Sequence, residues 1–546
     1  MPRLPRRHFL AAAAALASGA SRSSAAPGAA NPGATATAPA AATGTLRRVV
    51  STEITSMDPQ RPTGQVTTDL AAEMFTGLTY YDRAGRLTPG CATSWQASPD
   101  GLAWTFRLRS GLRWSDGRPL DARDFVYTLQ RYLSPETGAA QASRLEAIRG
   151  ARELRTGRIG VAALGVSAPD PLTLRIELEH PDVELPTVLS AAYCVPGHVI
   201  AQRGREWSRP EYLVGNGAYA LEQWAPGAKL IRLRRNPRFF DAAAVRIERV
   251  EWLTGYDDGT RLRLFRLGEV EIATLEDSGS LDIARRELGA ALRSAPVAAA
   301  GWIGINVSRG RLADPRLRRA LSLAIDRRVI TEKVRGLGEP ALDSLLPAGL
   351  PGQPAPQLPD YAAWPMPQRL AAARALLQQA GIAPGSLPPI GLGYVASPTG
   401  RKMFLAVAAM WKAIGIATEL RPYEGRAYNA ALNDGEFDAF SYATFAPVPM
   451  ALVFLDRFHS ASPINFCRWR SDEFDRAFDD GLRQPTPAGR SAAFAAAERV
   501  ALRELPVIPL HGGAANRLVS SRVEGWVDHP GHPHPSQYLA LRAPRA

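Results

Sequence analysis

The chain has 546 residues, of which 46% are hydrophobic and 21% charged, and its formal net charge is +13. This length exceeds what one hydrophobic core supports, so about two or three domains are expected. A basic chain is compatible with a nucleic-acid or membrane partner, but the cations are scattered and nearly all Arg. No long basic block and no recognition-helix or zinc-finger spacing occurs. Composition therefore favours an Arg-rich solvated surface and argues against nucleic-acid binding.

The N-terminal segment indicates export. Arg6 and Arg7 precede an Ala-rich apolar run at 11–17 and then small residues, which is typical of a twin-arginine signal peptide, predicted over residues 1–26. The run is too short to span a bilayer, and a structural N-terminal helix is the alternative. Residues 27–44 are rich in Ala, Pro, Gly and Thr and are predicted to be a disordered linker. Cleavage would leave a soluble protein in the periplasm.

Turn and periodicity signals are dense between Asp69 and Leu133. A helical start at Asp69 is followed by several turns rich in Asp, Ser and Gly. Residues 102–108 alternate apolar with polar side chains, which predicts a half-buried strand. Asp121 then occupies an N-cap position before apolar residues at helical spacing, so a helix is predicted to begin there.

Further helices are predicted in the second half of the chain. Asp314 is expected to cap a helix whose first residue is Pro315, since Pro suits that position. Another helix is predicted over residues 368–380, ending at Gly381. The glycines around Asn216 predict a tight turn rather than a phosphate loop, because no Gly-Lys-Ser/Thr follows them.

Short runs with specific spacing extend along the chain. In the first half they are Phe75-x-Gly77-Leu78, Leu87-x-Pro89, Ser94-Trp95, Asp100-Gly101-x-x-Trp104-x-Phe106-x-Leu108-Arg109, Trp114-Ser115-Asp116-Gly117 and Ala122-x-Asp124-Phe125. Later they are Gly215-Asn216-Gly217, Arg235-Asn236-Pro237, Asp314-x-Arg316-Leu317-Arg318-x-Ala320 and Gly435-Glu436-Phe437-Asp438. Over about residues 45–545 the chain resembles the extracellular solute-binding proteins of family 5, the peptide- and nickel-type receptors of ABC importers.

The resemblance implies a bilobal α/β fold. This is the Venus-flytrap fold of periplasmic binding proteins, with the extra subdomain of the dipeptide and oligopeptide receptors. The implied segments are lobe I at 45–77, 213–299 and 512–546, the extra subdomain at 78–212, and lobe II at 300–511.

The resemblance also implies a ligand cleft between the lobes. One lip is the loop at about Thr63 to Thr67, where Gln65 and Thr67 are candidate polar contacts, and an ordinary surface loop is the alternative. Trp302 lies at the crossover into lobe II and either stacks on ligand or fills the hinge core. The candidates for the opposite wall, after the Gly-x-Phe-Asp run, are Tyr442, Thr444, Phe445 and Pro447.

The chain departs from many peptide-binding relatives at this wall. Those relatives carry an Asp that holds the ligand's α-ammonium, because a charge-assisted bond in a dry cleft requires a carboxylate. Here Pro447 stands nearest that position, and no Asp or Glu occurs between Ala439 and Leu455. The sequence therefore favours a less cationic or capped ligand, or a metal chelate, over a peptide with a free amine.

Signals for metal binding and catalysis are weak. His529, His532 and His534 form a cluster that can bind a transition metal, but the surrounding Pro and Gly favour a loop, and no metal or cofactor is predicted. No zincin, nucleophile-elbow, Ser-x-x-Lys or dinucleotide motif occurs, so no enzyme is predicted. The cysteines share no close spacing, and one disulfide or three buried thiols are both open. They are Cys91, Cys194 and Cys467.

The sequence thus predicts the periplasmic substrate-binding component of an ABC importer. It would act as a monomer, close two lobes around a peptide or peptide-like solute, and deliver it to a membrane permease driven by an ATPase. The alternative on the same fold is a solute sensor or periplasmic chaperone that works without a transporter. A metal-chelate binder and an exported hydrolase are further alternatives.

Overall fold

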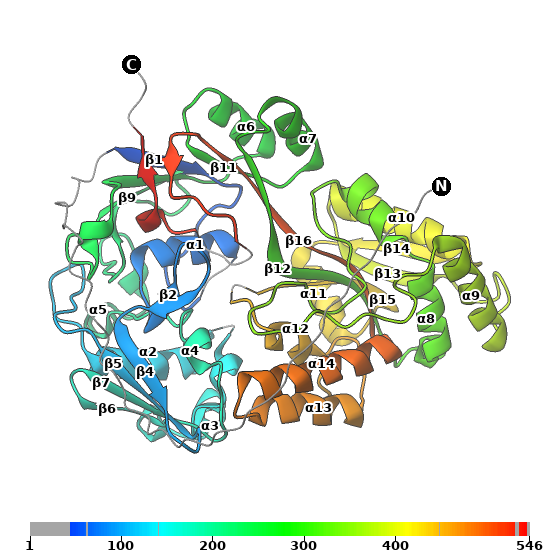
Figure 1. The fold of residues 1–546 in the computed structure, drawn as a ribbon, viewed down its shortest axis with the longest axis horizontal. Coiled ribbons are helices and arrows are strands. Elements are labelled where there is room, and N and C mark those ends of the chain that lie inside the picture. The colour runs from blue at the N-terminus through cyan, green and yellow to red at the C-terminus, as the bar shows by residue number, and fades with distance from the viewer. Residues whose placement is uncertain (1–43, 62–63, 140, 447, 530–533, 543–546) are drawn as a thin grey trace, which may run out of the picture. The chain divides into compact units, whose positions relative to one another are not determined.

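The computed structural model describes residues 44–61, 64–139, 141–446, 448–529 and 534–542, so the predicted signal peptide and almost all of the predicted linker lie outside it. The fold is α/β, as predicted, and is built on a ten-stranded mixed sheet (Figure 1). In spatial order its strands are β14 (Thr418–Tyr423), β13 (Ile390–Val395), β15 (Ala439–Phe445), β12 (Leu292–Ile305), β16 (Val507–Val519), β11 (Ile272–Leu275), β1 (Thr45–Val49), β10 (Arg249–Leu253), β9 (Leu230–Arg235) and β8 (Tyr219–Gln223).

Smaller sheets and helices complete the described fold. The smaller sheets are β4 (Ala92–Ala97), β5 (Ala103–Leu108), β7 (Thr173–Glu177) and β6 (Val166–Asp170); β2 (Thr79–Tyr81) and β3 (Leu87–Pro89); and β17 (Val523–Glu524) and β18 (Ala540–Leu541). The α-helices are α1 (Gln65–Met74), α2 (Ala122–Leu133), α3 (Ala151–Arg155), α4 (Leu185–Val188), α5 (Gly197–Arg203), α6 (Asp258–Arg266), α7 (Ser278–Glu287), α8 (Pro315–Leu323), α9 (Met366–Gln379), α10 (Pro398–Lys412), α11 (Gly425–Asp434), α12 (Leu452–Leu455), α13 (Asp472–Arg483) and α14 (Pro487–Glu504).

The two longest strands, β12 and β16, lie side by side at the centre of the large sheet (Figure 1). β12 pairs with β15 on one edge and β16 on the other, and β16 continues to β11. The pairing between β12 and β16 changes register between Gly301 and Trp302. A Cβ on Gly301 would lie 2.5 Å from Nε2 of His511, so Gly allows the strands to approach at this shift. The boundary predicted at residue 300 falls inside β12.

Helix α1 ends against the turn at residues 215–217. Asn216 Oδ1 accepts a 2.9 Å hydrogen bond from the backbone N–H of Thr76, and its amide donates to the carbonyl of Thr76 at the same distance. The backbone N–H of Gly217 donates to the carbonyl of Met74 at 2.8 Å. These bonds satisfy backbone groups at the end of α1, so the predicted tight turn holds this end of the helix in place.

The four-stranded sheet shows the predicted alternation with one difference. Phe106 and Leu108 on β5 are buried, whereas Leu102 precedes the strand and is 40% exposed. The turn at Ser98–Gly101 delays the strand, so β5 begins at Ala103, one residue after the predicted start at residue 102. Asp121 caps α2 as predicted, accepting a 2.8 Å bond from the backbone N–H of Arg123.

A buried ion cluster joins this part of the chain to α14. Arg490 on α14 is 2% exposed and lies 3.0 Å from Oδ1 of Asp182 and 2.8 Å from Oε2 of Glu184. The hydrophobic residues around it form one continuous cluster, which includes Leu185 on α4 and Phe494 on α14. Helices α13 and α14 pack against each other (Figure 1).

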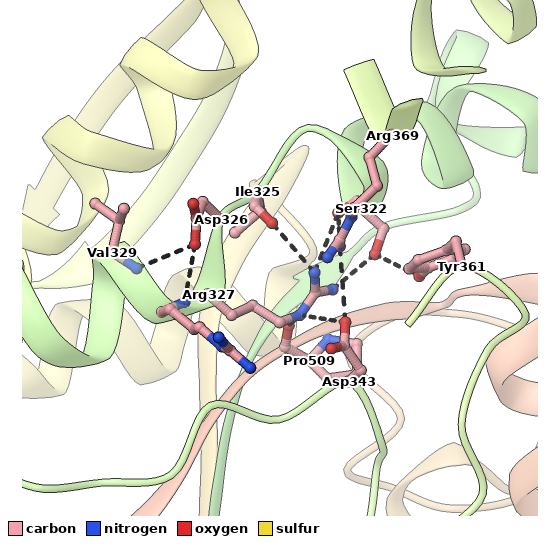
Figure 2. A network of polar contacts seen from close by, with 10 residues as sticks. Ser322, Ile325, Asp326, Arg327, Val329, Asp343, Tyr361, Arg369 and Pro509 are labelled. Atoms are coloured by element: carbon pink, nitrogen blue, oxygen red, sulfur yellow. Dashed lines mark hydrogen bonds and ion pairs between the residues drawn. The ribbon is translucent and has the colours of Figure 1, made fainter. Parts of the chain in front are cut away.

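A second buried network holds α8 and α9 to β16 (Figure 2). Arg327 donates from Nε to the carbonyl of Pro509 at 2.8 Å and lies 3.1 Å from Oδ1 of Asp343. Arg369 on α9 reaches the same carboxylate at 3.7 Å, and Ser322 Oγ bonds both Arg327 and the hydroxyl of Tyr361. Asp314 caps α8 with Pro315 at its first position, as predicted. Helix α9 begins two residues before the predicted start and ends before Gly381.

Glu498 on α14 provides a pH-dependent contribution to stability. Its carboxylate accepts bonds of 2.9–3.0 Å from the backbone N–H groups of Leu345, Leu346 and Gln357, and burial raises its pKa to about 7. The folded chain therefore retains a proton that the unfolded chain releases between about pH 4.5 and 7, so the free energy of unfolding falls as the pH rises through this range.

We expect Glu498→Gln to remove this pH dependence. The amide cannot accept all three backbone bonds, so unfolding at pH 5 should require about 1–3 kcal/mol less. The wild-type protein should lose up to about 3 kcal/mol between pH 4.5 and 7.5 through this residue, and the variant should not. Urea unfolding of both proteins at several pH values measures the difference, and parallel pH profiles would contradict the assignment.

The three cysteines, Cys91, Cys194 and Cys467, are buried free thiols in the structure, which decides between the two alternatives. Burial raises the pKa of each, so each stays protonated and unreactive. Within the described ranges, no helix is both long and apolar enough to cross a bilayer.

Candidate functional site

Pairing between β12 and β15 brings two predicted site residues together. Trp302 is directly opposite Tyr442 in the sheet, and their rings are 5.8 Å apart at an angle of 64°. Trp302 is 1% exposed and also contacts the rings of Phe454 and Phe458. In this conformation Trp302 fills the core beside the sheet, which is one of the two roles predicted for it.

Tyr442 is held by its hydroxyl group as well as its ring. The hydroxyl donates a 2.7 Å hydrogen bond to the carbonyl of Ile464, and burial raises its pKa. The side chain is 5% exposed, so its ring presents little surface to a ligand. Trp302 and Tyr442 together therefore form a rigid aromatic layer behind the end of β15.

The next predicted residues, Thr444 and Phe445, are half-buried at the end of β15. Thr444 Oγ1 accepts a 2.8 Å hydrogen bond from Nη2 of Arg457. The guanidinium of Arg457 lies 5.0 Å from the ring centre of Tyr442 and 5.9 Å from that of Trp302. Arg457 is therefore held between the aromatic layer and the half-buried end of the strand. Pro447 lies outside the described residues.

Arg457 belongs to a charged cluster that no local sequence pattern predicted. Asp456 Oδ1 lies 4.0 Å from Nε of Arg457, and the charge of Arg144, from the segment that follows α2, acts on the same carboxyl group. Burial raises the pKa of Asp456, against the opposing effect of the two guanidiniums, and burial lowers the pKa of Arg144. Asp456 is the first acid after the stretch between Ala439 and Leu455. The sequence signal for the cluster was the charged pair of Asp456 and Arg457 directly after an apolar run.

Two donors in this wall have no hydrogen-bond partner within the part of the chain that the structure describes. They are the indole Nε1 of Trp302 and Nε of Arg457, and both atoms are buried. Oδ1 of Asp456 is a buried acceptor in the same situation. Since an unsatisfied buried donor costs about 1–3 kcal/mol, this wall is suited to an acceptor group from elsewhere.

The predicted lip residues lie on a helix rather than in a loop, so the loop prediction was wrong. Gln65 begins α1, and its Nε2 donates to Oδ1 of Asp69 at 2.6 Å. The Thr67 hydroxyl bonds the backbone of Gly64, accepting from its N–H at 3.1 Å and donating to its carbonyl at 2.7 Å. Thr67 therefore caps the helix. This start could not be predicted, because Gly64 has no side chain that could act as a cap.

Three pockets of the described structure lie apart from these residues. Pockets of about 820, 450 and 370 Å³ contain none of the predicted site residues. A cavity of about 10 Å³ lies beside Arg144 and is also lined by Tyr132, Val448 and Met450. Such a volume holds about one water molecule, and it borders the charged cluster.

The His cluster is only partly described. The rings of His529 and His534 are 4.3 Å apart, and His534 stacks on Trp526 at 4.4 Å, while His532 lies outside the described residues. Among the residues that the structure covers, no group of three or more His, Cys, Asp or Glu side chains is arranged to hold a metal ion.

The sequence matches a known family and several characterised relatives. Residues 86–466 match the family described as bacterial extracellular solute-binding proteins, family 5. The chain is 32% identical over 489 residues to the probable deoxycholate-binding periplasmic protein YgiS of Escherichia coli, covering 89% of this chain and 90% of the relative. It is 29% identical over 491 residues to the E. coli periplasmic murein peptide-binding protein MppA, with 88% and 90% covered.

Solved structures show the same fold. The E. coli murein tripeptide binding protein MppA superimposes with a TM-score of 0.80 at 28% identity, covering 91% of this chain and 98% of that one. The Haemophilus influenzae OppA complex with the peptide RPPGFSPFR gives a TM-score of 0.77 at 27% identity, with the same coverage. These neighbours have the two-lobe α/β fold that the sequence predicted.

Proposed function

Because the chain belongs to the bacterial extracellular solute-binding proteins, family 5, we propose that it is the periplasmic substrate-binding component of an ABC importer. It captures a peptide or peptide-like solute and delivers it to a membrane permease driven by an ATPase. The observation that carries this proposal is the match along nearly the whole chain to periplasmic peptide-binding relatives, including MppA and OppA. These relatives are binding proteins, and the chain acts by binding rather than catalysis.

The proposal includes a mechanism of capture. Residues 45–77, 213–299 and 512–546 form lobe I, 78–212 the extra subdomain and 300–511 lobe II. The lobes share β12 and β16, so closure bends these strands. A ligand that contacts both lobes stabilises the closed state by its differential affinity for that state.

The proposed contact residues line two surfaces. Gln65 and Thr67 at the start of α1 supply one lip. The other wall is supplied by Trp302, Tyr442, Thr444, Phe445 and Pro447. Among those that the structure describes, the half-buried Thr444 and Phe445 are the most accessible, and Trp302 and Tyr442 support them from behind. A largely apolar wall with few polar anchors is what small-molecule clefts usually present.

Several finer features belong to the same proposal. The chain is exported by the twin-arginine route, since Arg6 and Arg7 precede the apolar run. It acts as a monomer in the periplasm, without a nucleic-acid partner. Its partners are the permease and ATPase in the inner membrane.

Native mass spectrometry of the gently purified mature protein tests the proposal. We expect one small molecule per chain, and refilling the emptied protein with that molecule should lower the radius of gyration in solution scattering. An unchanged radius at saturating ligand would contradict closure. A strain without the gene should lose uptake of the identified solute, whereas normal uptake with a lost cellular response would favour the sensor alternative.

A second candidate ligand class is an amphipathic solute without a free amine. It is favoured by the absence of any acid between Ala439 and Leu455, and the most identical of the relatives described above is named as probably deoxycholate-binding. We expect a free-amine tripeptide to raise the thermal midpoint less than its N-acetylated form. Stronger stabilisation by the free amine would show that a carboxylate elsewhere holds an ammonium group.

A further inference from the structure

The wall at the end of β15 is formed by Trp302, Tyr442, Thr444, Asp456 and Arg457. This wall contains an excess of positive charge. Arg144 and Arg457 both act on Asp456, which gives two guanidiniums for one carboxyl group. Within the described part of the chain, no carboxylate lies within 4 Å of Arg144, whose Nη1 donates to Oε1 of Gln141 at 2.8 Å. The side chain of Arg457 is 13% exposed. Buried charge is costly unless it is paired, so this region favours one additional negative charge.

Hydrogen bonding in the same wall is also incomplete. Nη2 of Arg457 is occupied by Thr444, but its Nε has no hydrogen-bond partner in the described structure, and neither has the indole Nε1 of Trp302. The ion pair between Arg457 Nε and Asp456 is loose, at 4.0 Å. Oδ1 of Asp456 is the one acceptor in this wall that is also buried without a partner in the described structure, so two donors face one acceptor. One further acceptor is therefore missing, in agreement with the missing negative charge.

The surroundings define what would carry that acceptor. The rings of Trp302 and Tyr442 lie beside the guanidinium, and the half-buried Phe445 ends the strand that carries Tyr442. A guanidinium is planar and its donors match the two oxygens of a carboxylate. A ligand that combines one carboxylate with an apolar body fits both features, whereas an ammonium group would add to the existing positive charge.

We propose that Arg457, with the nearby charge of Arg144 and the indole N–H of Trp302, forms an anion subsite that binds the carboxylate of an otherwise apolar ligand. The inference rests on the proposed function and adds the chemical class of the ligand. Asp456 competes with the ligand for Arg457 and so limits its affinity. A water molecule that bridges Arg457 and Asp456 is the alternative occupant.

Calorimetric titration with two matched pairs of probes tests the subsite. One pair is deoxycholate and its methyl ester, and the other is an N-acetylated tripeptide with a free carboxylate and the same peptide with a C-terminal amide. We expect Arg457→Gln to raise the Kd of the carboxylate probe about tenfold or more while the Kd of its uncharged partner changes less than twofold. Asp456→Asn should have the opposite effect and lower the Kd of the carboxylate probe.

Three further measurements make the result decisive. Arg457→Lys keeps the charge and should retain most of the affinity, which also covers the case in which Arg457→Gln folds poorly. Arg483→Gln removes an exposed cation on α13, in a pair with Asp479 at 3.8 Å, and should change no Kd. Raising the salt concentration should weaken carboxylate binding to wild type more than to Arg457→Gln.

The outcomes separate this proposal from the function it rests on. If Arg457→Gln weakens the charged and uncharged probes equally, or if Asp456→Asn weakens the carboxylate probe, the anion subsite is wrong, the bridging water is the better explanation, and the receptor function stands. If the wild-type protein binds no probe and retains no small molecule on purification, the proposed function fails together with the subsite.

Discussion

Replacing Arg490 by Met should lower the free energy of unfolding by about 3–5 kcal/mol. Arg490 lies between the carboxylates of Asp182 and Glu184 in a region where its own side chain is 2% exposed. The substitution leaves two buried carboxylates close to each other without a cation. Since this cluster joins α14 to the segment before α4, the loss should affect the whole cooperative unit. Urea unfolding followed by Trp fluorescence measures it.

The pH dependence of this loss identifies its cause. Burial already raises the pKa of Glu184, against the opposing charge of Arg490. Without that guanidinium the pKa of Glu184 should rise further, so the variant is most destabilised at neutral pH and recovers as the carboxylates take up protons at lower pH. A loss that is equal at pH 5 and pH 7.5 would mean that Arg490 contributes through packing alone.

Helix α14 also offers a matched control. Arg503 on the same helix pairs with Glu473 within 2.5 Å, but both side chains are more than half exposed. Arg503→Met should change the free energy of unfolding by less than about 1 kcal/mol. The triple variant Arg490→Met with Asp182→Asn and Glu184→Gln should be more stable than Arg490→Met alone, because it removes the unpaired charges.

Gly217→Ala should destabilise the chain by about 3 kcal/mol although it adds a single methyl group. An added Cβ would lie 2.4 Å from the carbonyl carbon of Met74, 2.6 Å from the amide nitrogen of Phe75 and 2.7 Å from the carbonyl oxygen of Glu73. All three are backbone atoms at the end of α1, so no rotamer change can relieve the clash. Thermal unfolding and the hydrogen-exchange protection of α1 should both decrease.

Gly160 supplies the control for this substitution. It has an ordinary φ of −81°, is exposed, and has no atom within 4 Å of an added Cβ. Gly160→Ala should therefore alter stability by no more than about 0.5 kcal/mol. Equal effects at the two glycines would show that the close approach at the end of α1 does not matter.

Local features of the fold could be predicted from the sequence where one residue determines the local geometry. Asp121 and Asp314 cap helices because a short acidic side chain reaches the free backbone N–H groups at a helix start. The alternation in β5 follows from a sheet with one buried face. The start of α1 was missed because Thr67 caps the helix from inside its first turn.

The candidate site was predicted less completely than the fold. Trp302, Tyr442 and Thr444 could be placed because their strands carry recognisable runs, and the structure pairs those strands in adjacent positions. The charged cluster could not be predicted, because Arg144 comes from a part of the chain distant from Asp456 and Arg457. Arg490 and its partners are another example, since no local pattern in the sequence specifies a contact across such a separation.

The position of β16 has a consequence for how the protein is made. This strand comes from the end of the chain, yet it lies between β11 and β12, so Ile272 pairs with Val519. Until β16 has been synthesised, β11 and β12 both present unpaired edges, which are sites for aggregation. The large sheet therefore cannot be completed during translation, and its formation depends on contacts distant in sequence, which fold slowly. A nascent or C-terminally truncated chain should need a chaperone that the finished protein does not.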